Sequence, residues 1–153
     1  MCEQSPATPL TPVVYTLDVG AGTFRRHDPA QPVVFWDDAA VTRGEAVFES
    51  VLVRAGRAAN LQRHLARLQR SAQRLELPVP ERELWARATK AAVTDWQQHL
   101  AEAGQRAGAL ADASGVDIGG VDAKCTWTYS RGRQSVAAPG MQPCLLYTSD
   151  AAD

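Results

Sequence analysis

Residues 46–78 read AVFESVLVRAGRAANLQRHLARLQRSAQRLELP, and this stretch decides the fold. Its first nine residues alternate between two sides, as the side chains of a β-strand do. One side carries Val47, Glu49, Val51 and Val53, and the other carries Phe48, Ser50 and Leu52. Because both sides are largely apolar, the pattern predicts a central strand over residues 46–54. Ala55-Gly56 predicts a turn into a short return strand.

A helix is predicted directly after this turn. Apolar side chains recur every three or four residues and so form one stripe along a helix. The stripe consists of Leu61, Leu65, Leu68, Ala72 and Leu75. Asn60 is a favourable N-cap, and Pro78 ends the helix. A second helix is predicted from Pro80 to about residue 103.

Further strands are predicted on both sides of the two helices. Residues 13–17, 33–36 and 125–130 are rich in β-branched and aromatic side chains, whereas residues 104–123 have no period and predict a loop. Strands, then two helices, then a strand are typical of an α+β domain. We therefore predict a mainly antiparallel sheet with two helices on one face, formed by residues 13–143 after a flexible leader over residues 1–12.

Composition and charge exclude several classes of protein. The formal net charge of −1 provides no overall attraction to nucleic acid or to an anionic membrane. No apolar run approaches the length of a membrane span. Cys2, Cys125 and Cys144 are odd in number and scattered, which favours neither disulfides nor a zinc site and predicts a reducing, cytoplasmic environment. We expect no metal, nucleic-acid or membrane partner.

The last ten residues, CLLYTSDAAD at positions 144–153, differ from the preceding chain because they contain no arginine. They resemble the translation of a transposase adapter used in sequencing libraries. This resemblance implies that the native sequence ends near Pro143 and that the gene continues. The alternative is a natural strand over residues 145–148 with a polar end.

Several motifs in a fixed order resemble one enzyme family, the class IV aminotransferases. Residues 38–50, DAAVTRGEAVFES, resemble its opening run, and residues 64–78, HLARLQRSAQRLELP, resemble its HLxRLxxSA segment and helix end. Residues 129–133, YSRGR, resemble its following strand and turn. The similarity covers residues 33–135. The SRGR turn and the leading VVYTLD are closer to actinobacterial 4-amino-4-deoxychorismate lyases than to the transaminases.

The resemblance implies pyridoxal 5'-phosphate as cofactor, a small-molecule substrate, a two-domain subunit and a homodimer. Residues 13–143 would be the smaller, N-terminal domain of such an enzyme. The lysine that forms the Schiff base would lie in a second domain, beyond this sequence. Lys90 and Lys124 do not match its position, so we expect the 153-residue chain by itself to be inactive.

One arginine is the predicted contact for the cofactor phosphate. Arg63, Arg67, Arg70 and Arg74 form a basic stripe that is offset from the leucine stripe. A guanidinium fork suits a phosphate, but spacing selects none of the four, and a solvated basic face also explains them. The match to HLxRL selects Arg67, whose family counterpart contacts the cofactor phosphate.

Phe48 and Arg43 are predicted substrate-pocket residues on the same resemblance. Core packing is the alternative for Phe48, and a surface or sheet-edge arginine is the alternative for Arg43. Two departures from the motif lie nearby, because Glu45-Ala46 replaces the usual Asp-Gly and Ser50 replaces the usual Thr. Ala46 is tolerable there only if its φ is negative.

The resemblance implies a lyase that removes pyruvate from 4-amino-4-deoxychorismate and leaves 4-aminobenzoate, a folate precursor. The nearest rival is a transaminase of the same family that acts on branched-chain or D-amino acids. A rival of another class is a binding module that uses the arginine stripe to contact RNA or DNA. The near-neutral total charge disfavours that module.

Overall fold

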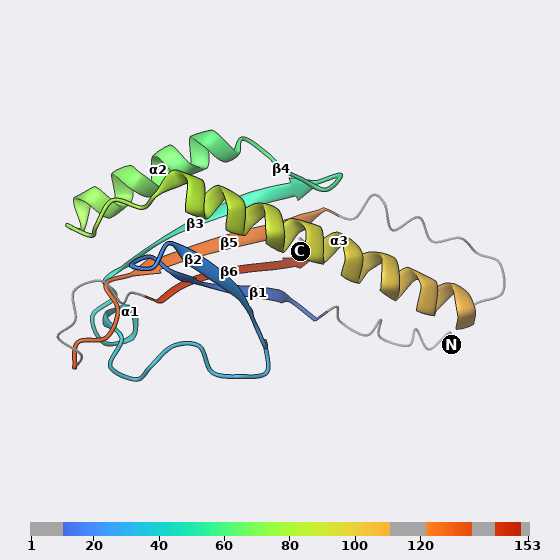
Figure 1. The fold of residues 1–153 in the computed structure, drawn as a ribbon, viewed down its shortest axis with the longest axis horizontal. Coiled ribbons are helices and arrows are strands. Elements are labelled where there is room, and N and C mark those ends of the chain that lie inside the picture. The colour runs from blue at the N-terminus through green and yellow to red at the C-terminus, as the bar shows by residue number, and fades with distance from the viewer. Residues whose placement is uncertain (1–10, 111–121, 136–142, 151–153) are drawn as a thin grey trace, which may run out of the picture.

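Two long helices cover one face of a six-stranded sheet, as Figure 1 shows. The computed structural model describes residues 11–110, 122–135 and 143–150. The described ladders are antiparallel, and the strand order is β2-β1-β6-β5-β3-β4. This arrangement confirms the predicted α+β class, with an antiparallel sheet and two helices on one face. In chain order the elements are β1 (Val13–Asp18), β2 (Thr23–His27), α1 (Ala39–Thr42), β3 (Ala46–Arg54), β4 (Arg57–Ala58), α2 (Leu61–Arg74), α3 (Arg82–Leu110), β5 (Ala123–Ser130) and β6 (Pro143–Asp150).

The hydrophobic core lies between the sheet and helices α2 and α3. Strand β3 alternates as predicted, since its odd-numbered side chains are buried and its even-numbered ones from Phe48 onward are exposed. Leu65, Leu68 and Ala72 of the predicted stripe are buried on this face, whereas Leu75 lies beyond the end of α2 and is exposed. Helix α3 adds Trp85 and Trp96. Strand β5 contributes Trp127, whose ring centroid lies 5.6 Å from that of Trp85. These large apolar side chains account for much of the burial that stabilises the domain.

Strand β3 is less central than its apolar character predicts. It pairs with β5 from Ala46 to Val53, whereas β4 pairs only with Val53 and Arg54. The return strand is short because helix α2 begins at Leu61, immediately after the hairpin. The Leu52 carbonyl also accepts a 2.8 Å hydrogen bond from Ala59 N on this side. Along residues 47–51, the side of β3 away from β5 is therefore a free strand edge among the described residues.

The strand predicted at residues 33–36 is wrong. These residues form an exposed loop, in which Trp36 is 79% exposed. Strand β1 pairs on one side with β2, because the Gly20–Gly22 turn folds the chain directly back and Asp18 Oδ1 accepts a hydrogen bond from Ala21 N. The polar sequence of β2 does not alternate clearly, so no strand was predicted there.

Helix α2 begins where predicted but lacks the predicted side-chain cap, and the bounds of helix α3 differ from the prediction. Asn60 precedes α2, but its backbone is left-handed (φ 50°) and its side chain makes no capping hydrogen bond. Helix α3 begins at Arg82 and continues to Leu110, so the first part of the predicted loop over residues 104–123 is helical. The rest of that loop, residues 111–121, and positions 1–10 of the predicted leader lie outside the described residues. No helix in the described part of the chain has the length and apolar character needed to span a bilayer.

Strand β6 lies between β1 and β5 and pairs with both. Its bounds include most of the segment that resembles an adapter translation. The strand alternative for this segment agrees with the observed backbone. The adapter origin stays a prediction, and the DNA sequence of the locus tests it.

Tyr15 is expected to make the stability of the chain fall at alkaline pH. Its hydroxyl donates a 2.7 Å hydrogen bond to Asp95 on α3, and burial together with this contact raises its pKa from 10.0 to about 12. Between about pH 10 and pH 12 the unfolded chain loses this proton while the folded chain keeps it, so the stabilisation is lost as pH rises. Tyr15→Phe should cost about 1–2 kcal/mol at pH 8 and remove this part of the pH dependence. Urea unfolding at pH 8 and pH 11 measures both effects, and an unchanged alkaline loss in Tyr15→Phe would contradict the assignment.

Gly56 is expected to tolerate alanine poorly because of its backbone. Ala55 (φ 48°) and Gly56 (φ 69°) form the two-residue turn between β3 and β4, a geometry that needs positive φ at both positions. Gly56→Ala should cost about 1–2 kcal/mol through the left-handed backbone. An added Cβ would also meet the Gln97 side chain, which is exposed and can rotate away.

Gly22→Ala is the matched control for Gly56→Ala, because Gly22 has φ 65° and open space around it. The two variants should lose similar stability in urea unfolding. A much larger loss for Gly56→Ala that Gln97→Ala relieves would show that crowding, and not backbone conformation, limits this position.

Candidate functional site

Arg67 lies on α2 and reaches toward the first half of β3. Its Nε is 3.1 Å from Glu49 Oε1, and 55% of its side chain is exposed. Arg63, Arg70 and Arg74, the other members of the basic stripe, are also exposed. Arg67 is thus an exposed cation that pairs with Glu49 of strand β3. A basic helix face that only contacts solvent would not need such a partner.

Glu49 is a buried carboxylate that sequence reasoning missed. It is 4% exposed and lies between two basic side chains of α2. His64 Nδ1–H donates to Glu49 Oε2 at 2.7 Å, and Arg67 pairs with the other carboxylate oxygen. A buried carboxylate without partners is strongly disfavoured, so these contacts explain how the strand tolerates it. The signal that could have revealed it was a single glutamate among valines on the buried side of the strand.

Phe48 lies on the opposite face of the sheet from this carboxylate. Its side chain is 74% exposed and stands opposite Thr128 in the β3–β5 register. The alternative of core packing within this chain is therefore excluded. Phe48 and Arg67 lie on different sides of β3, beside its free edge, and do not form one contact cluster.

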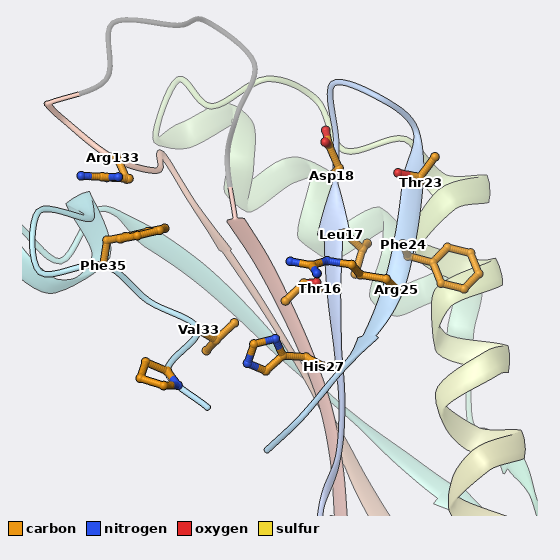
Figure 2. Close-up of a pocket in the computed structure, with 11 residues that line it drawn as sticks. Thr16, Leu17, Asp18, Thr23, Phe24, Arg25, His27, Val33, Phe35 and Arg133 are labelled. Atoms are coloured by element: carbon orange, nitrogen blue, oxygen red, sulfur yellow. The ribbon is translucent and has the colours of Figure 1, made fainter. Parts of the chain in front are cut away.

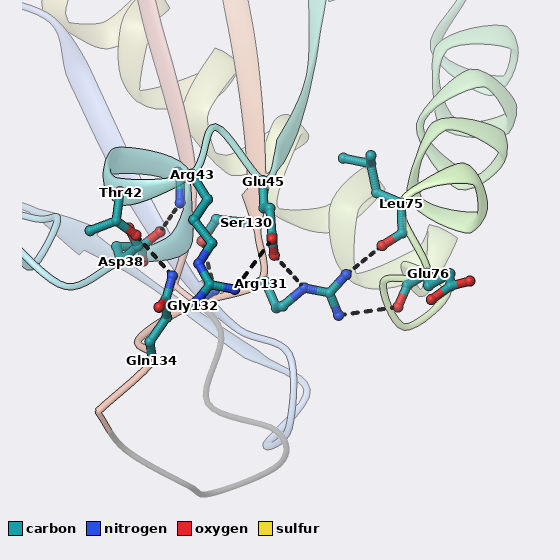
Figure 3. A network of polar contacts seen from close by, with 11 residues as sticks. Asp38, Thr42, Arg43, Glu45, Leu75, Glu76, Ser130, Arg131, Gly132 and Gln134 are labelled. Atoms are coloured by element: carbon teal, nitrogen blue, oxygen red, sulfur yellow. Dashed lines mark hydrogen bonds and ion pairs between the residues drawn. The ribbon is translucent and has the colours of Figure 1, made fainter.

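Arg43 belongs to a network at the start of β3 that Figure 3 shows. Its Nη1 is 3.9 Å from Glu45 Oε1, and 63% of its side chain is exposed. Arg131 makes the closer pair with Glu45, at 2.7 Å, and also donates to the Leu75 carbonyl at the end of α2. The left-handed backbone of this turn falls on Gly44 (φ 67°), whereas Ala46 keeps a negative φ, as its substitution in the motif requires.

The loop before α1 is fixed to the chain that follows β5. Asp37 accepts hydrogen bonds from Ser135 and Arg133, which hold the pKa of this carboxyl below its usual value. The Arg133 guanidinium also lies 4.1 Å from the centroid of the Phe35 ring. Asp38 caps α1 by accepting from Ala40 N at 2.8 Å. These contacts set the position from which Arg43 leaves α1.

A groove of about 370 Å³ opens between this loop and the β1–β2 hairpin (Figure 2). Arg25, His27 and Arg133 line it together with Asp18, and Phe35 adds an apolar wall. None of the predicted site residues lines it. Sequence reasoning missed the groove because its lining comes from separate segments of the chain that only folding brings together.

The two lysines lie apart from the Glu49–His64–Arg67 cluster. Lys124 stands opposite Leu52, three residues beyond Glu49 along β3, which is about 10 Å of strand. Lys90 lies on α3 and lines a groove of about 700 Å³ together with Gly56 and Gln97. Neither lysine belongs to the cluster around the predicted phosphate contact.

Comparisons with known proteins identify a family. The family model described as amino-transferase class IV matches residues 46–151. A protein of Mycobacterium tuberculosis (strain ATCC 25618 / H37Rv), named bifunctional aminodeoxychorismate lyase / D-amino acid transaminase, is 37% identical over 111 residues. The matched region is 72% of this chain and 32% of that protein.

Solved structures share the fold. A candidate aminotransferase from Corynebacterium glutamicum ATCC 13032 is 35% identical with a TM-score of 0.74, over 95% of this chain and 50% of that one. A fold IV transaminase from Curtobacterium pusillum is 26% identical with a TM-score of 0.72, over 93% and 43%. A hypothetical aminotransferase from Mycobacterium tuberculosis, solved with PLP bound, is 30% identical with a TM-score of 0.66, over 91% and 40%. The chain thus spans about a third of the curated relative and half or less of these solved chains.

Proposed function

Because this chain belongs to the class IV aminotransferase family, whose members are pyridoxal-phosphate-dependent enzymes, we propose that it is the N-terminal part of a 4-amino-4-deoxychorismate lyase. The observation that carries this proposal is the 37% identity to a relative whose name includes that activity. The enzyme would work in the cytoplasm as a homodimer and supply 4-aminobenzoate for folate biosynthesis. Neither nucleic acid nor a membrane would be a partner.

The residues near Arg67 fit the phosphate of the cofactor. Glu49 engages Nε, and in the described part of the chain no ion pair or hydrogen bond is seen for the two Nη groups. Those groups form a planar fork that suits two phosphate oxygens. The described residues offer no lysine in this cluster, so the covalent tether would come from a second domain.

Each predicted site residue would have a separate task in the complete enzyme. Pyridoxal phosphate supplies the electron sink for the amine-bearing carbon of the substrate. Arg67 would hold the phosphate, and the exposed ring of Phe48 would form a wall of the substrate pocket that excludes water. Arg43 would pair with one of the two substrate carboxylates. Its only close acidic neighbour among the described residues is Glu45, at 3.9 Å, so it stays available for this pairing.

The proposed reaction is an elimination. A proton leaves the amine-bearing carbon of 4-amino-4-deoxychorismate, and the C–O bond between the ring and the enolpyruvyl group breaks. The released enol then takes up a proton on its methylene carbon and becomes pyruvate. The ring that remains is 4-aminobenzoate. Because aromatisation drives the reaction, the protein mainly needs to orient the substrate and keep water out.

The test begins with the DNA beyond the codon for Pro143. The uninterrupted reading frame is the genomic frame that continues past the Pro143 codon in place of the adapter-like segment. The enzyme that it encodes should release pyruvate from 4-amino-4-deoxychorismate without any amino acceptor. Release that requires a 2-oxo acid would contradict the lyase assignment. A natural stop after Asp153, or a downstream half without a suitably placed lysine, would contradict the whole proposal.

A second candidate is transamination by the same site. The relative from Mycobacterium tuberculosis also carries the name of a D-amino acid transaminase, which favours D-amino acids over branched-chain ones as donors. Amino transfer from D-alanine to 2-oxoglutarate, measured beside pyruvate release, separates the two candidates. Transfer without pyruvate release from the chorismate derivative would favour this second function.

The 153-residue chain is expected to form no covalent adduct with pyridoxal phosphate at either lysine. Lys90 and Lys124 lie outside the Arg67 cluster, so a cofactor bound at Arg67 would not present its aldehyde to them. Borohydride reduction followed by peptide mass spectrometry checks this. A stoichiometric adduct on one of the two lysines, formed at low cofactor excess, would contradict the expectation.

A further inference from the structure

We propose that Glu49 is a positioning residue that aims the Arg67 guanidinium at the cofactor phosphate, with His64 holding Glu49 in place. This inference rests on the proposed function, because it assumes that Arg67 binds that phosphate. It goes further by assigning a role to a buried carboxylate that does not touch the cofactor.

Glu49 occupies a position that apolar packing would favour. Its neighbours on the helix-facing side of β3, Val47 and Val51, are buried valines, and Trp127 lies opposite it in the register. Glu49 itself is only 4% exposed. Replacing such a buried ion pair by apolar residues is commonly neutral or stabilising, so stability alone does not account for the glutamate.

The two carboxylate oxygens of Glu49 contact different side chains of α2. Oε2 accepts from His64 Nδ1–H at 2.7 Å, and His64 is only 18% exposed, so this contact is the enclosed one. Oε1 lies 3.1 Å from Arg67 Nε. His64 and Arg67 are three residues apart on α2 and therefore lie on the same side of the helix.

The contact through Nε decides which way the guanidinium points. A carboxylate at Nε lies on the side edge of the guanidinium, so it leaves open the outer edge, which carries one N–H from each Nη group. The arginine side chain is long, and its rotamers would otherwise be free, because 55% of it is exposed. Glu49 thus restricts the fork to one orientation before the phosphate arrives, which lowers the entropic cost of binding.

The experiment uses the apoenzyme expressed from the uninterrupted reading frame and compares affinities for pyridoxal phosphate and pyridoxal. Glu49→Gln keeps the side-chain shape but removes the charge that holds Nε. It should weaken pyridoxal phosphate binding by about tenfold and leave pyridoxal binding unchanged, because only the former has a phosphate. His64→Gln should also lower the affinity ratio, which is the affinity for pyridoxal phosphate divided by that for pyridoxal, but by a smaller factor. It is the second variant should Glu49→Gln fail to fold.

A double-mutant cycle separates positioning from a general structural effect. In an Arg67→Ala background, Glu49→Gln should have no further effect on the affinity ratio. Asp122→Asn is the matched control, because Asp122 pairs with Arg54 at the other end of β3 and should leave the ratio unchanged. An equal loss of affinity for both ligands, or a Glu49→Gln effect that persists without Arg67, would overturn the positioning role alone. An Arg67→Ala variant with normal affinity for pyridoxal phosphate would overturn the phosphate contact and this inference with it.

Discussion

Arg67→Ala is expected to weaken pyridoxal phosphate binding by about 10- to 100-fold in the enzyme expressed from the uninterrupted reading frame. Hydrogen bonds to a charged group contribute about 1.5–3 kcal/mol, and each 1.4 kcal/mol changes affinity about tenfold. The exposed Nη groups of Arg67 are the donors that the substitution removes. Equilibrium titration of the apoenzyme with the cofactor measures the loss.

Two further variants make the Arg67 prediction specific. Arg67→Lys keeps the positive charge but loses the planar fork, so it should recover only part of the affinity. Arg63→Ala removes an exposed arginine of the same helix and should leave the dissociation constant unchanged. Equal losses in Arg63→Ala and Arg67→Ala would point to the overall charge of the helix instead of a phosphate contact.

Trp127→Ala is expected to destabilise the domain by about 3–5 kcal/mol, the usual cost of removing a large buried aromatic side chain. Trp127 is fully buried in the core between the sheet and α3, where its ring centroid lies 5.6 Å from that of Trp85. A loss of this size is a large fraction of the stability of an ordinary domain. Equilibrium unfolding in urea, followed by circular dichroism, measures it.

The controls for Trp127→Ala use the same residue type. Trp127→Phe should cost much less than alanine, because it keeps a ring and because no hydrogen-bond acceptor for the indole N–H is found among the described residues. Trp36→Ala removes a tryptophan that is 79% exposed and should change stability by less than about 0.5 kcal/mol. Similar losses at positions 36 and 127 would contradict the assigned core.

The site was only partly predictable from the sequence. The strand alternation placed Phe48 and Glu49 on opposite sides of β3, and the observed burial agrees. The resemblance selected Arg67 from four similar arginines, which spacing could not do. The partner of Arg67 was not predicted, because the alternation places Glu49 among valines but does not say which side chains of α2 lie over it.

Local periodicity by itself determined strand β3, the apolar stripe of α2, and the order of strands and helices that defines the α+β class. These features follow from the repeat of the backbone within one element, so nearby residues suffice to reveal them. Only the tertiary structure decided that residues 23–27 and not residues 33–36 form a strand of the sheet, and that β3 has a free edge. It also decided that His64 and Arg67 enclose Glu49, and that Tyr15 reaches Asp95 across 80 residues of sequence. Such contacts depend on how whole elements pack against one another, and no local pattern encodes that packing.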